Sequence, residues 1–340
     1  MSKNSGIISK LDWEALVDDA LIKRKEARIT QKHHAALAGV SIPTMISFEK
    51  AETTISLQKV LDILNVVGLV AKHKPKNHLE IFARDAALKW FELTKHLDNN
   101  DPAKHYYGHK SYSFQIEKPS FDISYEDFNE LLVKTASVKL SGWSPFWIPR
   151  SEDIKPYSPE KNIVECWLAK ENHFDRSYLT TDFWRASKDG FFYLQRGYKE
   201  DDICKPKEVF DLYSPVREAV EVIFYAIRFA QNLKINPSNK ITFNLEYKGL
   251  QGRTIANLSD PLRPLLDKGK VAQRDSITMS TEFLLNEINE PFYEPLAEIA
   301  MRLLKELYSE FGFFELEYSY IEHIVKDMFS RMNQSSKAFE

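Results

Sequence analysis

The sequence has little cysteine, and it has no long apolar run. Only Cys166 and Cys204 occur among 340 residues, and they form no CxxC pair, so neither a disulfide framework nor a zinc site is expected. No apolar stretch approaches the roughly 20 residues that a membrane-spanning helix needs. The opening MSKNSGIISKLDWEAL does not follow the pattern of a secretion signal. These absences predict a protein of the reducing cytoplasm.

Motifs that mark common catalytic and cofactor-binding sites are also missing. The 11 glycines are scattered, and neither GxxxxGK[ST] nor GxGxxG occurs. The motifs GxSxG and HExxH are absent as well. His105 and His109 are four residues apart, but the glycine and tyrosines between them indicate a loop and not a metal-binding helix. The sequence therefore predicts no catalytic site, no cofactor and no bound metal.

Charge of one sign is not in large excess, since the formal net charge is −3 at pH 7. The charges are unevenly spread, however. Residues 1–78 contain 12 lysines and arginines against 8 aspartates and glutamates, whereas the remaining residues contain 34 against 41. A basic head on an acidic body is compatible with a nucleic-acid contact at the N-terminal end only.

What the sequence does contain is enough apolar material for a packed core, with 43% hydrophobic and 13% aromatic residues. In the first 70 residues, apolar positions recur at helical spacing in four segments. Thr30, Ser41 and Ser56 precede three of them as N-caps, and Gly39 follows the second as a C′ glycine would. Pro43 lies in a first helical turn, where its missing N–H removes no intrahelical bond. The segments predict helices over 11–28, 31–38, 42–50 and 57–69, followed by a short edge strand over 68–75.

The stretch ITQKHHAALAGVSIPTMISFEK, residues 29–50, combines Thr-Gln, a small residue at Ala35, a glycine at the turn and apolar residues at Met45 and Phe48. This spacing resembles the helix-turn-helix of phage-repressor/Cro-like (Xre-type) regulators. Together with TTISLQKVLDILNVVGLVAK it is similar to the HipB-like branch, in which a strand follows the last helix. The resemblance covers residues 15–78. It implies a lambda-repressor-like all-α domain whose helix over 42–50 enters the major groove of double-stranded DNA.

The resemblance also implies roles for individual residues. Arg24 and Glu49 fall where the family has a structural Arg–carboxylate pair between the first helix and the recognition helix. Phosphate contacts are implied for Gln31, Thr44 and Lys50, and base-edge contacts for Ile42, Pro43, Ile46 and Ser47. The complete set of implied DNA-binding residues is Gln31, Ser41, Ile42, Pro43, Thr44, Ile46, Ser47 and Lys50.

Several positions depart from the family pattern. Ile42 and Pro43 stand where hydrogen-bonding side chains are frequent, so apolar contact and DNA shape would carry more of the readout. Ala51 replaces the usual glycine after the recognition helix, and Glu52 brings an acidic charge close to the expected phosphates. His34 occupies a position that is usually apolar. A purely structural helical domain, with no DNA contact, is the alternative for residues 1–78.

The rest of the chain predicts a connecting helix and linker over 79–118 and a larger α+β domain over 119–340. Helices are expected over 125–138 and 214–233, and over much of 281–332. Short runs rich in β-branched and aromatic residues predict strands over 146–150, 162–169, 190–198 and 241–249.

Four of the six tryptophans of the chain lie between residues 143 and 184. The simpler interpretation is a tryptophan-rich core with an arginine at a turn. The functional interpretation is an aromatic-walled pocket for an anionic ligand. Its candidate residues are Trp143, Trp147, Trp184, Arg185, Arg196 and Arg253.

The sequence thus predicts a DNA-binding transcriptional regulator that is not an enzyme. It would act as a homodimer on a pseudo-palindromic operator, because one such module contacts few bases. The 68–75 strand, the larger domain or both would form the dimer, and the larger domain would respond to a small-molecule or protein effector. Two alternatives stay open: an antitoxin-like protein that also binds a toxin, and an effector enzyme controlled by its own helix-turn-helix. The operator, the sign of regulation and the effector do not follow from the sequence.

Overall fold

The structure is a computed structural model, in which the chain divides into two compact units, residues 1–76 and residues 77–340. The residues it describes are 12–38, 40–70, 78–117, 123–137, 140, 144–169, 177–178, 180–258, 270–312 and 316–337. The predicted domain boundary at residue 78 lies two residues from this division.

The first unit contains four helices among its described residues: α1 Trp13–Glu26, α2 Gln31–Ala38, α3 Ile42–Glu49 and α4 Leu57–Val66. Thr30 and Ser41 cap α2 and α3, since their hydroxyl oxygens accept the backbone N–H of His33 and Thr44. Ser56 has an N-cap backbone conformation but accepts no such bond. Gly39 and residues 71–77 lie outside the described residues, and with them most of the predicted edge strand; Leu69 and Val70 form a bend.

A small core joins the four helices. Ala35 is 1% exposed, Met45 0% and Phe48 1%, so the three positions singled out by the motif are all inside. Ile63 of α4 is fully buried, whereas Leu57 at the start of this helix is 72% exposed. The remaining buried apolar residues of this core are Val17, Ala20, Ala38, Val60 and Leu64.

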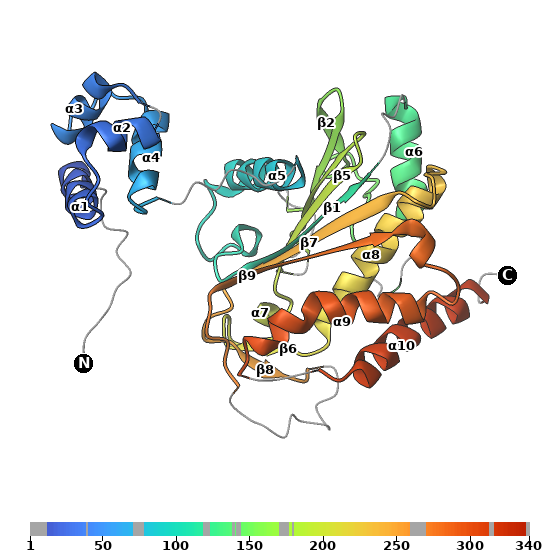
Figure 1. The fold of residues 1–340 in the computed structure, drawn as a ribbon. Helices are drawn as coiled ribbons and strands as arrows, with labels where there is room; N and C mark the ends of the chain where they lie inside the picture. Colours follow the sequence, from blue (N-terminus) through green and yellow to red (C-terminus); the bar gives the residue numbers. More distant parts are fainter. Residues whose placement is uncertain are drawn as a thin grey trace. The chain divides into compact units, whose positions relative to one another are not determined.

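The larger unit is built on a seven-stranded antiparallel sheet in the order β2-β3-β4-β5-β1-β7-β9 (Figure 1). Its strands are β1 His109–Ile116, β2 Tyr157–Glu160, β3 Ile163–Trp167, β4 Phe183–Ser187, β5 Phe191–Gly197, β7 Lys240–Lys248 and β9 Ser276–Leu284. Two short parallel strands, β6 Val209–Asp211 and β8 Thr254–Ala256, form a separate pair. The described part of this unit is therefore α+β, as predicted.

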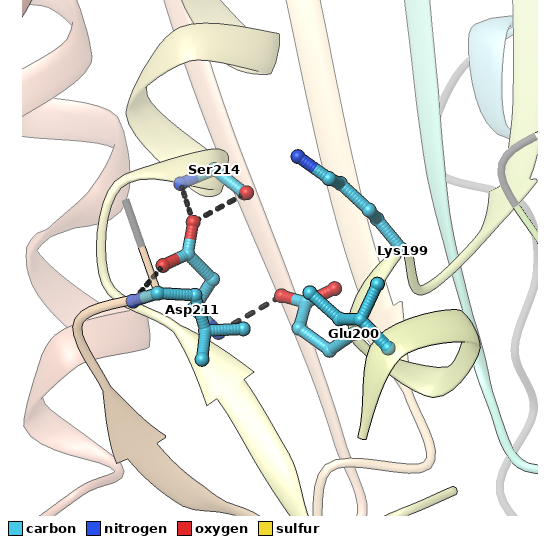
Figure 2. A pocket seen from close by; sticks show the side chains of 6 residues that line it. Lys199, Glu200, Asp211 and Ser214 are labelled. Carbon is cyan, nitrogen blue, oxygen red and sulfur yellow. Dashed lines mark hydrogen bonds between the residues drawn. The ribbon is translucent and has the colours of Figure 1, made fainter. Parts of the chain in front are cut away.

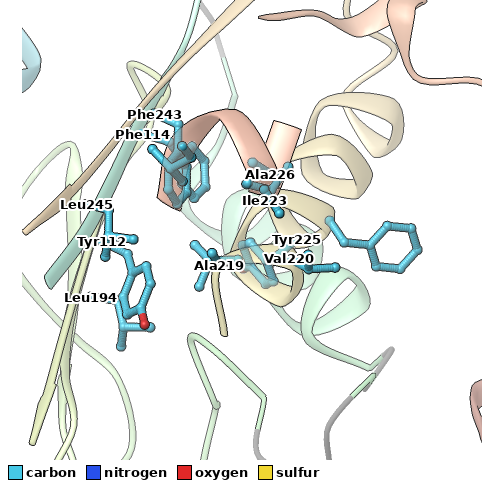
Figure 3. Close-up of a cluster of buried hydrophobic side chains, with 14 of the residues drawn as sticks. Tyr112, Phe114, Leu194, Ala219, Val220, Ile223, Tyr225, Ala226, Phe243 and Leu245 are labelled. Atoms are coloured by element: carbon cyan, nitrogen blue, oxygen red, sulfur yellow. The ribbon is translucent and has the colours of Figure 1, made fainter. Parts of the chain in front are cut away.

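Helices cover both faces of this sheet. The described helices are α5 His78–Thr94, α6 Tyr125–Ala136, α7 Glu200–Ile203, α8 Ser214–Asn232, α9 Tyr293–Ser309 and α10 Tyr318–Lys337, with 3-10 turns at Pro102–Lys104 and Leu285–Glu287. Figure 3 shows Tyr112 and Leu245 of the sheet facing Ala219 and Ile223 of α8 in the main core. On the other face, Ala86 of α5 packs against Phe183 and Tyr193.

Three sequence predictions for this unit were wrong. Residues 79–118 are not a connector: α5 packs on the sheet, and β1 lies inside it between β5 and β7. The stretch HKSYSFQI, which has some strand character in the sequence, forms β1, and most of its residues are buried. Residues 146–150 form no strand, because Pro149 lacks an N–H for a ladder bond and Phe146 has a φ of 54°. Residues 281–284 belong to β9, whose alternating exposed and buried positions mark a strand.

Candidate nucleic-acid interface

Helix α3 presents one face to the core and the other to solvent. Met45 and Phe48 anchor it inside, whereas Ile42 and Ile46 are 38% and 39% exposed. Pro43 is also exposed. An amphipathic helix normally turns its large apolar side chains inward. The outward isoleucines of α3 are therefore the unusual feature of this helix.

The polar residues assigned to DNA contact lie at the two ends of α3 and along its partly exposed side. Ser41 is exposed, and its hydroxyl lies 2.9 Å from the hydroxyl of Thr44. Ser47 is half-buried, and Lys50 directly after the helix is exposed. Lys50 is thus the one cation among the residues from 41 to 50.

A three-residue cluster holds α3 to α1 and α2. The guanidinium group of Arg24 forms an ion pair with the Oε1 atom of Glu49. The amide of Gln31 donates to the Oε2 atom of Glu49 at 2.8 Å. The carboxylate of Glu49 is thereby bonded on both oxygens, which sets the angle at which α3 meets the rest of the unit. Gln31, assigned to phosphate from the sequence, has its N–H group directed to Glu49 instead.

The end of α3 is fixed by Trp13 of α1. Its ring packs edge-on against Phe48 with the ring centroids 5.7 Å apart, and its indole N–H donates to the carbonyl of Ala51 at 2.7 Å. Ala51 has a φ of 56°, the left-handed conformation that favours glycine. The alanine at this position therefore adopts a backbone conformation that glycine adopts more readily.

His34 replaces an apolar residue without disturbing the core. It is 2% exposed, and its Nε2 atom lies 3.0 Å from the carbonyl oxygen of Ile63, which links α2 to α4. Its Nδ1 atom has no hydrogen-bond partner. His34 is thus part of the core of this unit and does not reach the exposed face of α3.

The basic character of the N-terminal segment does not come from the described helices. Residues 12–70 contain seven lysines and arginines against eight aspartates and glutamates. The excess of positive charge within residues 1–78 depends on lysines outside the described residues, namely Lys3, Lys10, Lys72, Lys74 and Lys76.

The tryptophans proposed as pocket walls belong largely to the main core. Trp184 is fully buried, and its indole N–H donates to the carbonyl of Trp147 at 2.9 Å. Phe146 packs edge-on against the same ring. Trp143 lies outside the described residues. These contacts agree with the simpler interpretation, a tryptophan-rich core.

The three arginines proposed for that pocket are each bonded to a carboxylate. Arg185 donates to Glu160, and Arg196 donates to the buried Asp182. Arg253 is 0% exposed and forms a two-pronged pair with Asp201, at 2.8 and 2.7 Å. It also donates to the carbonyl groups of Tyr107, Val209 and Gly249. A guanidinium group with all of its donors directed into the protein joins loops together and does not receive an anionic ligand.

A different set of residues lines a small open pocket in the larger unit (Figure 2). Asp211 accepts the N–H and hydroxyl of Ser214 at the start of α8, at 2.9 and 2.6 Å. Glu200 accepts the N–H of Asp211 at 2.8 Å through Oε1, while its Oε2 atom is buried and has no partner. Burial raises the pKa of this carboxyl. The full lining is Lys199, Glu200, Ile203, Asp211, Ser214 and Leu258.

Sequence reasoning missed this pocket because its residues come from three separate segments. The acidic KEDDI and the DLYSP stretch, in which an aspartate precedes a serine and a proline, were the only local signals.

Among the described residues, no three His, Cys, Asp or Glu side chains are placed to hold a metal ion. In the same part of the chain, no helix has the length and apolar character to cross a membrane. No family model, no curated protein and no solved structure matches the chain.

Proposed function

We propose that the chain is a sequence-specific DNA-binding transcriptional regulator, with residues 12–70 as its helix-turn-helix domain and α3 as its recognition helix. The observation that carries the proposal is the arrangement of α2 and α3. They are separated by residues 39–41, share one core, and leave the outer face of α3 exposed. The major groove of DNA is wide enough to admit one helix presented in this way.

The cluster of Arg24, Gln31 and Glu49 supports the same role. A recognition helix must be held rigidly, because a small tilt would move all of its contacts relative to the bases. Here two hydrogen-bonded partners from α1 and α2 hold the carboxylate at the end of α3. Lys32 in the first turn of α2 and Lys50 directly after α3 are both exposed and could contact phosphates.

A homodimer and an effector response by the larger unit complete the proposal. Two copies of α3 would read the two halves of a pseudo-palindromic operator. The pocket lined by Lys199, Glu200 and Ser214 offers a place for a small effector, since it brings charged and polar side chains to one open cavity. Trp184 and Arg253, by contrast, are buried and bonded to Trp147 and Asp201, so they are not part of this proposed effector site.

The test is selection of binding sites from a random duplex library by the full chain. We expect a two-fold-symmetric sequence to be enriched. The double variant Ser47→Glu, Lys50→Glu should lose this enrichment, because it places negative charge where phosphates and base edges would lie. Circular dichroism checks that the variant stays folded.

The matched control makes the same charge change on α1. Ala15 and Lys23 are exposed, so Ala15→Glu, Lys23→Glu alters net charge equally without touching α3. We expect this control to select the wild-type site. Equal loss in both double variants would show a non-specific charge effect, and no enrichment by the wild type would contradict the proposed function.

A further inference from the structure

Two isoleucines stand on the solvent side of α3, one turn apart. Ile42 and Ile46 are each more than a third exposed, and positions i and i+4 of a helix bring side chains together on one face. Leaving two β-branched apolar side chains in water forgoes the stabilisation that burial would give. This face therefore fits an apolar partner that approaches α3 from outside.

The same face is poor in groups that read bases by hydrogen bonds. Residues 42–50 contain no asparagine, glutamine or arginine, so Lys50 at the end of the helix is the one side chain in this range that could form paired bonds with a base. The hydroxyls of Ser41 and Thr44 are bonded to each other and cap the helix. The amide of Gln31 is directed to Glu49. Only Ser47 remains as a polar side chain in the middle of the helix.

We propose that α3 recognises thymine-containing half-sites through contact of Ile42 and Ile46 with thymine C5-methyl groups, an inference that rests on the proposed DNA-binding function. In the major groove, thymine alone among the four bases presents a methyl group. The exposed cation Lys50, which follows Ile46 by one turn at the end of α3, favours a polyanion over an apolar protein surface as the partner. Side chains at i and i+4 are about 5–6 Å apart, and bases of one strand are about 3.4 Å apart. The two isoleucines thus suit two thymines within one or two base-pair steps.

The test removes the methyl group and nothing else. In the duplex selected by the full chain, each half-site thymine is replaced in turn by deoxyuridine, and the dissociation constant is measured. We expect affinity to fall about fourfold for each methyl that an isoleucine contacts, the factor for returning one methyl-sized group to water. Replacing the same thymine by 5-methylcytosine, paired with guanine, should bind more tightly than replacing it by cytosine.

A variant of the protein tests whether Ile46 is the side chain that contacts the methyl group. Ile46→Ala shortens the side chain but keeps a strong helix former, and it should bind the thymine and deoxyuridine forms of its contacted position equally. Ile22→Ala is the matched control, because Ile22 is a 54% exposed isoleucine on α1. This control should keep the wild-type preference for thymine.

The outcomes separate the two proposals. If the wild type selects a site and binds its thymine and deoxyuridine forms equally, the methyl readout is wrong and DNA binding stands. If no duplex is selected, both fail. In that event, a smaller assembly of Ile46→Ala than of the wild type in sedimentation would assign the isoleucine face to a protein contact.

Discussion

At the scale of single residues, Ala51 adopts a strained backbone conformation just after α3. The residue has a φ of 56° and presents its carbonyl to the indole N–H of Trp13. A left-handed conformation costs an L-residue about 1–2 kcal/mol, and glycine adopts it without that cost. The contact with Trp13 is made by the backbone carbonyl of Ala51 and not by its side chain.

Ala51→Gly should therefore stabilise the first unit by about 0.5–1 kcal/mol, the relief of strain less the greater flexibility of glycine in the unfolded chain. Ala27→Gly is the matched control, because Ala27 ends α1 with a φ of −74°, and it should destabilise by a similar amount. Hydrogen exchange of the α1–α3 amides in the full chain measures both. If Ala51→Gly destabilises the first unit as Ala27→Gly does, Ala51 is not strained.

At the scale of elements, the packing of α5 on the sheet depends on two neutral histidines. The ring of His105 stacks on Trp90 of α5 with the centroids 5.4 Å apart, and its Nε2 atom lies 3.0 Å from the hydroxyl of Thr181. The ring of His109 also contacts Trp90. Burial, together with the nearby His109 and Lys110, holds the pKa of His105 well below its usual value. Burial and Lys248 lower the pKa of His109 to about 3.

Acid should therefore weaken the larger unit. A lowered histidine pKa means that the unfolded chain binds protons that the folded chain does not, so stability present above pH 6.5 is lost as the pH falls through that value. Between pH 7.5 and 5.5 each histidine should lower the free energy of unfolding by on the order of 1 kcal/mol. Urea titrations measure this loss, and His109→Gln should remove about half of it. The exposed His33 on α2 supplies the control His33→Gln, which should leave the loss unchanged.

At the scale of the whole molecule, the proposed function requires two copies of α3 on one face of DNA. One eight-residue helix contacts too few bases to select a genomic site, and dimeric helix-turn-helix proteins place their recognition helices about one turn of DNA apart. The dimer must therefore fix the distance between its two copies of α3, and the spacing between the two half-sites of the operator measures that distance.

Inserting five base pairs between the half-sites of the selected duplex should weaken binding at least about tenfold, because the second half-site turns to the opposite face of the DNA. Inserting ten base pairs restores the face and should weaken binding less. Gel-shift titrations with the full chain measure both duplexes. Equal affinity for the two insertions would mean that the chain binds as independent monomers.

The sequence by itself determined the local structure of the first unit. The caps at Thr30 and Ser41 follow from short-range rules, because a helix closes its hydrogen bonds within a few residues. The same rules predicted α8 from its strong apolar periodicity. The resemblance singled out Ala35, Met45 and Phe48, and the structure buries all three. The pairing of Arg24 with Glu49 came from the resemblance, and the structure contains it.

Features that depend on contacts between distant residues were decided only by the tertiary structure. β1 looks like a polar connector until β5 and β7 bond to both of its edges, because a strand obtains its hydrogen bonds from other segments. Arg253 resembles a ligand-binding arginine in the sequence, and it became a buried clamp because Asp201 lies beside it in the fold. The orphaned oxygen of Glu200 likewise results from segments that meet only on folding. Helices and caps are local, whereas strand partners, ion pairs and pockets depend on residues distant in the chain.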